Sequence, residues 1–196
     1  MSKVIIVIFG RKFSGKTTTA RAIRGLLDDA KVDSFADPIK KGVAEMFGIP
    51  MKNMRDPVLK EKEVCFGKTI RYLLQTLGTE WGKDLIDPSV WTWLAMQRVH
   101  QATQRVIIFD DGRFPKEEGD WVERYCQAQG WTFYKFKVER KSDNVIGESI
   151  ARHRSETSLD GVAMPTLYNT GTKVSTLKKN IEQFVKFRIL NEIKES

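Results

Sequence analysis

The residues best suited to chemistry stand near the start of the chain, in one short loop. Gly10 is followed by four residues and then by Gly15, Lys16 and Thr17, which fills the pattern G-x-x-x-x-G-K-[ST] without a mismatch. In this pattern the glycines let the backbone turn so that successive N–H groups point at a polyphosphate. The lysine reaches the β- and γ-phosphates, and the threonine hydroxyl holds Mg²⁺. We expect the following residues to bind a nucleoside triphosphate: Gly10, Arg11, Lys12, Phe13, Ser14, Gly15, Lys16, Thr17 and Thr18.

The elements on either side of this loop are those that such a site requires. Residues Val4–Phe9 form a continuous apolar, mostly β-branched run, which is typical of a strand buried on both faces. Residues Thr18–Leu27 alternate polar and apolar side chains at helical spacing. The positive end of this helix would point at the same anion. A glycine-rich turn that binds nothing is the simpler alternative, and the strand and helix argue against it.

Composition limits the classes of protein to consider. The chain has 196 residues, of which 41% are hydrophobic and 30% charged, as in a soluble globular domain. No apolar run approaches the roughly 20 residues that span a bilayer, and the first residues do not resemble a signal peptide. Cys65 and Cys126 suggest reduced thiols in a cytosolic compartment. We expect one domain over residues 1–196, with no membrane partner.

The chain is basic, with a net charge of +8 and a pI near 9.5. Such a charge permits nucleic-acid binding, but phosphate-bearing substrates explain it equally. Because the basic residues are spread out, with no run of five or six, we favour small anionic substrates and disfavour nucleic acid.

A second strand is predicted at Lys31–Ala36, followed by Asp37 and Pro38. In an open α/β sheet, ligands bind beyond the carboxyl ends of the strands. Asp37 and Lys40 would therefore lie near the loop of residues 10–17, which we call the phosphate loop, if this strand is next to the first. Asp37 as an N-cap before Pro38 is a compatible and simpler interpretation.

The middle of the chain is predicted to be helical. Leu73, Leu77, Trp81 and Leu85 recur at spacing four, which places them on one apolar stripe. The simplest interpretation is a core helix with a solvated polar face that carries Arg71, Gln75 and Glu80. The predicted helices are Pro38–Phe47, Thr69–Leu85 and Ser89–Gln101, with a loop and one short helix over 51–68.

A third strand, Arg105–Phe109, ends in Asp110, Asp111, Gly112 and Arg113. A carboxylate at the end of such a strand can hold Mg²⁺ through water, and an arginine there would lie beside the phosphates. Either aspartate could serve the metal, and we expect Asp110. The remaining predicted elements are a helix over 115–129, strands Trp131–Val138 and Ala163–Tyr168, and a helix Val174–Ile193.

Residues 140–156 are rich in cations, among them Arg140, Arg152, His153 and Arg154. Phosphoryl transfer needs mobile cations that close over the transferring group and exclude water. We therefore expect an arginine-rich helical lid, although a solvated basic helix is an alternative. A metal site at His153 is disfavoured, because the chain has two histidines and no clustered cysteines.

Five further motifs are spaced along the chain: FADPIK at 35–40, RYLLQTLGTEWG at 71–82, DDGRFPKE at 110–117, HRSE at 153–156 and YNTGT at 168–172. Together they resemble the bacteriophage deoxynucleoside monophosphate kinases. The resemblance covers nearly the whole chain in the right order. It implies a three-layer α/β fold of the P-loop NTPase type, with a five-stranded parallel sheet, helices on both faces and a helical lid over about 140–156.

The resemblance also implies an activity, namely transfer of the ATP γ-phosphate to a 2′-deoxynucleoside 5′-monophosphate with Mg²⁺ as cofactor. It places the protein in the cytoplasm, that of the host if the chain is phage-encoded, and leaves a homodimer open. A helical region at about 37–104 would bind the monophosphate. The implied substrate residues are Asp37, Lys40, Arg71, Gln75, Glu80, Trp81, Asp111 and Arg113; the implied catalytic residues are Lys16, Arg113, Arg140, Arg152 and Arg154.

Two other functions compete with this one. A kinase acting on dephospho-coenzyme A shares the phosphate loop, the aspartate after the second strand and the arginine lid; the 71–82 motif favours the deoxynucleotide. A nucleic-acid-binding ATPase is the second alternative, and it predicts DNA affinity with a steep salt dependence.

Overall fold

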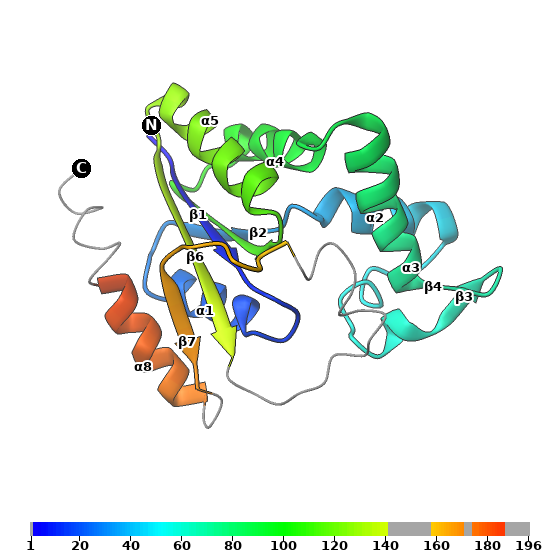
Figure 1. Cartoon of the computed structure of the whole chain (residues 1–196), viewed down its shortest axis with the longest axis horizontal. Helices are drawn as coiled ribbons and strands as arrows, with labels where there is room; N and C mark the ends of the chain where they lie inside the picture. Colours follow the sequence, from blue (N-terminus) through cyan, green and yellow to red (C-terminus); the bar gives the residue numbers. More distant parts are fainter. Residues whose placement is uncertain (1, 141–157, 171–173, 187–196) are drawn as a thin grey trace. The chain divides into compact units, whose positions relative to one another are not determined.

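Five strands form one sheet, in the order β2-β5-β1-β6-β7, and every neighbouring pair is parallel (Figure 1). The computed structural model describes residues 2–140, 158–170 and 174–186. The strands are β1 Val4–Phe9, β2 Ala30–Asp33, β5 Val106–Gly112, β6 Thr132–Arg140 and β7 Thr166–Asn169. The central position of β1 explains its unbroken apolar run, since all six of its residues are buried.

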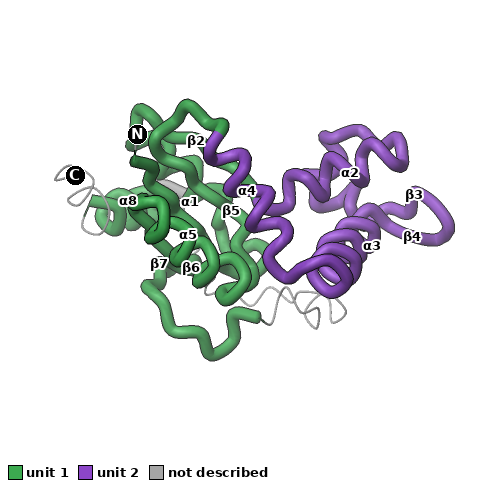
Figure 2. The backbone as a smooth tube through the Cα atoms, turned by 90° about the horizontal axis from the view of Figure 1, so that it is seen from above, with its two compact units in different colours: residues 1–34, 101–196 green, residues 35–100 purple. Residues whose placement is uncertain are grey.

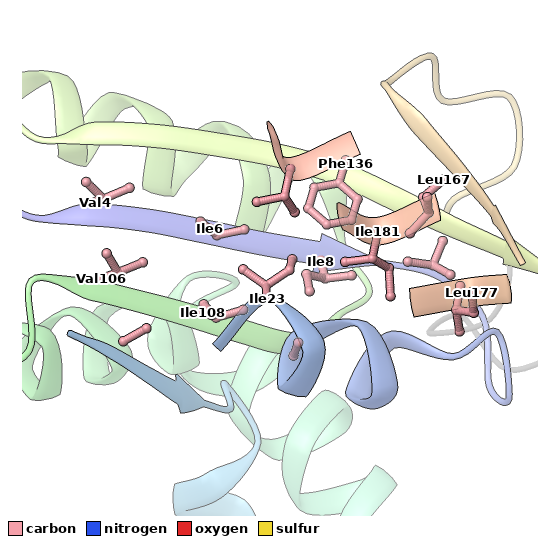
Figure 3. Close-up of a cluster of buried hydrophobic side chains, with 14 residues drawn as sticks. Val4, Ile6, Ile8, Ile23, Val106, Ile108, Phe136, Leu167, Leu177 and Ile181 are labelled. Atoms are coloured by element: carbon pink, nitrogen blue, oxygen red, sulfur yellow. The ribbon is translucent and has the colours of Figure 1, made fainter. Parts of the chain in front are cut away.

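Helices cover both faces of this sheet. On one face, Ile6 of β1 and Ile108 of β5 belong to the same core cluster as Ile23 of α1 and Ile181 of α8 (Figure 3). On the other face, helix η3 approaches Phe9 at Gly119, and α5 contacts β6. The helices are α1 Lys16–Arg24, η3 Pro115–Asp120, α5 Trp121–Gln129 and α8 Val174–Val185. The fold is therefore the predicted three-layer α/β sandwich of the P-loop NTPase type.

The chain divides into two compact units (Figure 2). Unit 1 comprises Met1–Ser34 and Gln101–Ser196 and contains the five-stranded sheet. Unit 2 comprises Phe35–His100. Its limits lie close to those of the helical region predicted at about 37–104. The function of residues 1–196 as one kinase domain stays a prediction.

Unit 2 contains helices and one hairpin. Its core includes Val43, Met54 and Ile70. The hairpin β3–β4 turns at Phe66 and Gly67, both with positive φ, and the sequence analysis missed it because its strands are only three and two residues long. The elements are α2 Asp37–Phe47, η1 Leu59–Glu61, β3 Glu63–Cys65, β4 Lys68–Thr69, α3 Ile70–Gln75, η2 Thr76–Ile86 and α4 Val90–Gln101.

The single α-helix predicted over Thr69–Leu85 is wrong, because the chain changes to a π-helix, η2, at Thr76. Its buried residues are Gly78, Thr79, Gly82 and Lys83. Trp81 and Leu85, placed by the sequence analysis on an apolar stripe, are instead exposed. The hydrogen bonds of a π-helix join residues five apart, so an α-helical periodicity selects the wrong face.

The sequence analysis placed Asp37 and Lys40 near the phosphate loop on the condition that the second strand lies next to the first. The structure does not meet this condition. Strand β2 pairs with β5, and β5 separates it from β1. It ends at Asp33, three residues earlier than predicted. The single helix predicted over 115–129 also begins as a π-helix, η3, and continues as α5 from Trp121. The predicted end of the last helix, Ile193, lies outside the described residues. The other predicted strands and helices that fall within the described residues agree in type, with ends shifted by a few residues. No helix in the described ranges is long and apolar enough to cross a membrane.

Candidate functional site

The loop between β1 and α1 has a backbone that only glycine can supply at two positions. Gly10 has φ +150° and Gly15 has φ +108°. A Cβ on Gly10 would lie 2.6 Å from the Val138 carbonyl oxygen, and one on Gly15 would lie 2.8 Å from Nδ2 of Asn169. Both the conformation and the close approach of β6 and β7 therefore exclude side chains here.

Lys16 lies at the centre of this loop. Its side chain is buried, and its Nζ donates hydrogen bonds to the carbonyl oxygens of Gly10 at 2.5 Å and Arg11 at 2.9 Å. The loop thus wraps around a desolvated ammonium group at the first residue of α1. A positive charge at the N-terminus of a helix, lined by backbone, is the arrangement that binds phosphate.

The loop's own hydrogen bonds leave a cradle that fits a polyphosphate. The Ser14 N–H bonds to the Arg11 carbonyl, and the Gly15 carbonyl accepts from Thr19 N–H as the first bond of α1. Buried Ser14 Oγ has no hydrogen-bond partner among the described residues. An orphaned hydroxyl beside two glycines is the kind of polar group that a phosphate oxygen can satisfy.

The donor groups at this loop fit a Mg²⁺ ion that is bound together with phosphate groups. The Thr17 side chain is exposed and that of Thr18 half-buried in the first turn of α1. Within the described ranges, no three His, Cys, Asp or Glu side chains form a group that could hold a metal. Mg²⁺ usually keeps several waters and uses one or two carboxylates plus substrate phosphates, so Thr17 and an aspartate of β5 would suffice.

The two aspartates at the end of β5 occupy a β-bulge. Val7 pairs with Phe109 and Phe9 with Gly112, so Asp110 and Asp111 together stand opposite Ile8. Asp111 Oδ2 accepts a hydrogen bond from Ser34 Oγ at 2.5 Å, which ties β5 to the end of β2. The extra residue thus places two half-buried carboxylates where a regular strand would place one.

Arg113 follows the bulge on a firmly held backbone. The buried carboxylate of Glu118 accepts the N–H groups of Arg113 at 2.6 Å and Phe114 at 3.0 Å. The hydroxyl of Ser158 donates to the Arg113 carbonyl. The half-buried Arg113 side chain therefore starts from a fixed point just beyond the carboxyl end of β5.

The predicted lid is only partly described. Arg140 is exposed at the end of β6, in register with Asn169 of β7. Arg152 and Arg154 lie outside the described residues. Just after that stretch, Asp160 forms an ion pair with Arg11 of the phosphate loop.

The remaining candidate residues lie in unit 2. Asp37 is the first residue of α2, and its carboxylate pairs with Lys41 at 2.9 Å and Arg55 at 3.9 Å. The prediction that Asp37 is the N-cap is wrong, because Ala36 is the N-cap and the helix begins at Asp37, one residue earlier than predicted. The carboxylate therefore serves ion pairs rather than the helix end.

Arg71 and its neighbours lie on α2, α3 and η2, and α2 contacts both of the others. The Arg71 Nε donates to Glu61 Oε1 at 2.5 Å. Lys40 and Gln75 are half-buried, whereas Glu80 and Trp81 are exposed. Figure 2 shows these elements as members of unit 2, whereas the loop of residues 10–17 is a member of unit 1.

Two buried polar residues near the site were not singled out by the sequence analysis. Glu118 holds the backbone of Arg113, and Asn169 donates to the Ser14 carbonyl at 3.0 Å. Each stands at a buried position. For Asn169 a signal was available, since it follows buried Leu167 at the two-residue spacing of a strand, where an apolar residue is expected.

Comparison with known proteins finds no matching protein-family model and no matching curated protein. Among solved structures, the chain is similar to TT1252 from Thermus thermophilus, with 17% sequence identity and a TM-score of 0.50. The likeness covers 98% of each chain. It supports the three-layer α/β fold described above.

Proposed function

We propose that this protein transfers the γ-phosphate of ATP to a 2′-deoxynucleoside 5′-monophosphate, which yields the diphosphate. The observation that carries the proposal is buried Lys16, held by the Gly10 and Arg11 carbonyls inside a loop that tolerates only glycine at two points. The choice of acceptor is supported by the motifs at 35–40 and 71–82, which resemble the phage kinases.

The residues of unit 1 would bind and activate the donor. Lys16 would exchange its backbone carbonyl partners for the β- and γ-phosphates, while the first N–H groups of α1 bind the same oxygens. Thr17 and Asp110 would hold Mg²⁺, and the ion would supply positive charge that neutralises the phosphate groups. Arg113, Arg140, Arg152 and Arg154 would supply further positive charge around the transferring group.

The residues of unit 2 would bind the acceptor. Arg71 is the leading candidate for the monophosphate, because guanidinium groups bind phosphate through two parallel hydrogen bonds. Glu61, which now pairs with Arg71, would compete with that phosphate. Asp37, Lys40, Gln75, Glu80 and Trp81 would also face the monophosphate substrate. Asp111, which belongs to unit 1, is a further candidate substrate residue.

The mechanism needs no general base. The attacking oxygen of a monophosphate is already an anion, so positioning and charge neutralisation supply most of the rate enhancement. Such an enzyme would act in the cytoplasm, that of the host if it is phage-encoded, either as a monomer or as a homodimer.

The test is ADP release from Mg–ATP with each common deoxy- and ribonucleoside monophosphate in turn. We expect at least one deoxynucleotide to stimulate turnover well above the rate without acceptor. If dephospho-coenzyme A alone stimulates ADP release, the acceptor is wrong and the donor site stands. If only DNA does so, with affinity that falls steeply with salt, the protein is a nucleic-acid-dependent ATPase.

A further inference from the structure

Strand β7 carries an amide where its pattern calls for an apolar side chain. Leu167 is buried in the core cluster beneath α8, and Asn169, two residues on, is only 9% exposed. Burying an amide costs free energy unless its groups find hydrogen-bond partners. An apolar residue would therefore stabilise the core more, which suggests that Asn169 serves another purpose.

The partner of this amide is the backbone of the phosphate loop. Asn169 Nδ2 donates to the carbonyl oxygen of Ser14 at 3.0 Å, in a buried contact. The C=O and N–H of a trans peptide point in opposite directions. Holding the Ser14 carbonyl toward β7 therefore turns the Gly15 N–H away from β7.

Asn169 lies close enough to the Ser14–Gly15 peptide to restrict its orientation. A Cβ on Gly15 would lie 2.8 Å from Asn169 Nδ2 and 3.7 Å from Leu177 Cδ2 of α8. On its other side, the Gly15 carbonyl is bound by Thr19 N–H. The two peptides that flank Gly15 are thus held independently, one by Asn169 and one by α1.

We propose that Asn169 is a positioning residue, which holds the Ser14–Gly15 peptide in the orientation that the ATP phosphates require. The inference rests on the proposed use of the loop for ATP. Asn169 contacts the backbone of the loop, so its loss weakens ATP binding by letting the peptide rotate. The monophosphate acceptor is not affected in this way.

The experiment measures the Kd of Mg–ATP by calorimetry and the KM of each substrate for three variants. Asn169→Leu has a similar volume and removes the donor without adding charge; Asn169→Asp keeps the shape and removes the donor. Thr166→Val is the matched control, because Thr166 lies on the same strand as Asn169 and its side chain also donates a hydrogen bond, to the Met164 carbonyl that precedes the strand. Thermal unfolding without nucleotide is measured for all of them.

We expect both Asn169 variants to raise the Kd and KM of ATP by about tenfold. This is the size of effect that the loss of one hydrogen bond produces. The KM of the monophosphate and the values for Thr166→Val should stay within about twofold. A purely structural role would lower the melting temperature and leave the ratio of the two KM values unchanged.

Three outcomes would overturn the inference. The first is unchanged ATP affinity in Asn169→Leu, and the second is failure of both Asn169 variants to fold, which would make the amide structural. The third is a wild-type protein that does not bind Mg–ATP, which would overturn the proposed function as well and is seen before any variant is made.

Discussion

The phosphate loop of unit 1 and the π-helix η2 of unit 2 each contain a pair of glycines, and the two pairs have different neighbours. Gly10 and Gly15 have positive φ and lie against strands β6 and β7. Gly82 instead makes room for a side chain, since a Cβ there would lie 2.4 Å from Cζ2 of Trp91. The indole Nε1 also donates to the Gly78 carbonyl at 2.6 Å.

This difference shows two ways of building a candidate site. The loop offers its own backbone N–H groups, so a short motif is enough to recognise it. In unit 2 the candidate groups are side chains such as Arg71 of α3 and Trp81 of η2. The face on which Trp81 lies depends on whether its helix is α or π. Perturbing the two units separately should therefore have separable effects.

The largest effect is expected for Lys16→Ala, which should lower turnover by a factor of about 10³ or more while leaving the fold intact. Lys3→Ala is the matched control. Each lysine is 8% exposed, and Lys3 Nζ donates to the carbonyls of Ala102 at 2.6 Å and Gln104 at 2.7 Å. Lys3 lies at the amino end of β1, whereas the phosphate loop follows its carboxyl end. The loss of the Lys3 side chain should therefore lower the melting temperature without raising the ATP KM. Near-normal turnover in a folded Lys16→Ala protein would refute the assignment.

Gly82→Ala should destabilise unit 2 by about 3 kcal/mol, because the new methyl group collides with buried Trp91. Gly42→Ala provides the comparison within the same unit. Its Cβ would meet Leu77 Cδ2 at an ordinary 3.7 Å, and alanine in a helix is favoured by up to about 1 kcal/mol. Urea denaturation, followed by tryptophan fluorescence, measures both. Equal stabilities of the two variants would contradict the tight packing of Trp91 on η2.

Arg71→Ala should raise the KM of the monophosphate by about tenfold and leave that of ATP unchanged, since one phosphate contact is lost. Lys68→Ala removes an exposed cation from the same unit, one that lies over the Tyr72 ring, and serves as the control for loss of charge. Steady-state kinetics with each substrate varied gives both values. A rise confined to the ATP KM would exclude Arg71 from the acceptor site.

The smallest consequence for function is expected at the two thiols, one in each unit. Burial, with a smaller contribution from Glu123, raises the pKa of Cys126 to about 12. At pH 8 its thiolate fraction is then about one in 10⁴, so a thiol–disulfide reagent should not modify it in the native protein. Half-exposed Cys65 should react at once. Absorbance of the released thiol should show one group before urea is added and two after; two native groups would contradict the burial of Cys126.

Local patterns were sufficient for the five strands of the large sheet and for the loop of residues 10–17. The apolar runs of β1 and β5 predict buried strands because such runs have few other stable places in a folded protein. Local patterns were insufficient where the structure of a segment depends on a strand that is distant in the sequence. The two aspartates of β5 form a bulge only because Phe9 pairs with Gly112, and β2 lies beside β5 because of how the chain crosses over.

By itself, the sequence determined the buried strands of the sheet, the loop at residues 10–17 and the lysine inside it. Those features depend on residues close together in the chain, where glycine conformation and strand hydrophobicity act directly. Only the tertiary structure decided that η2 is a π-helix, that Glu118 holds the backbone of Arg113 and that Asn169 reaches Ser14. The last contact joins residues 155 positions apart, and it exists because parallel strands bring their carboxyl ends to one edge of the sheet.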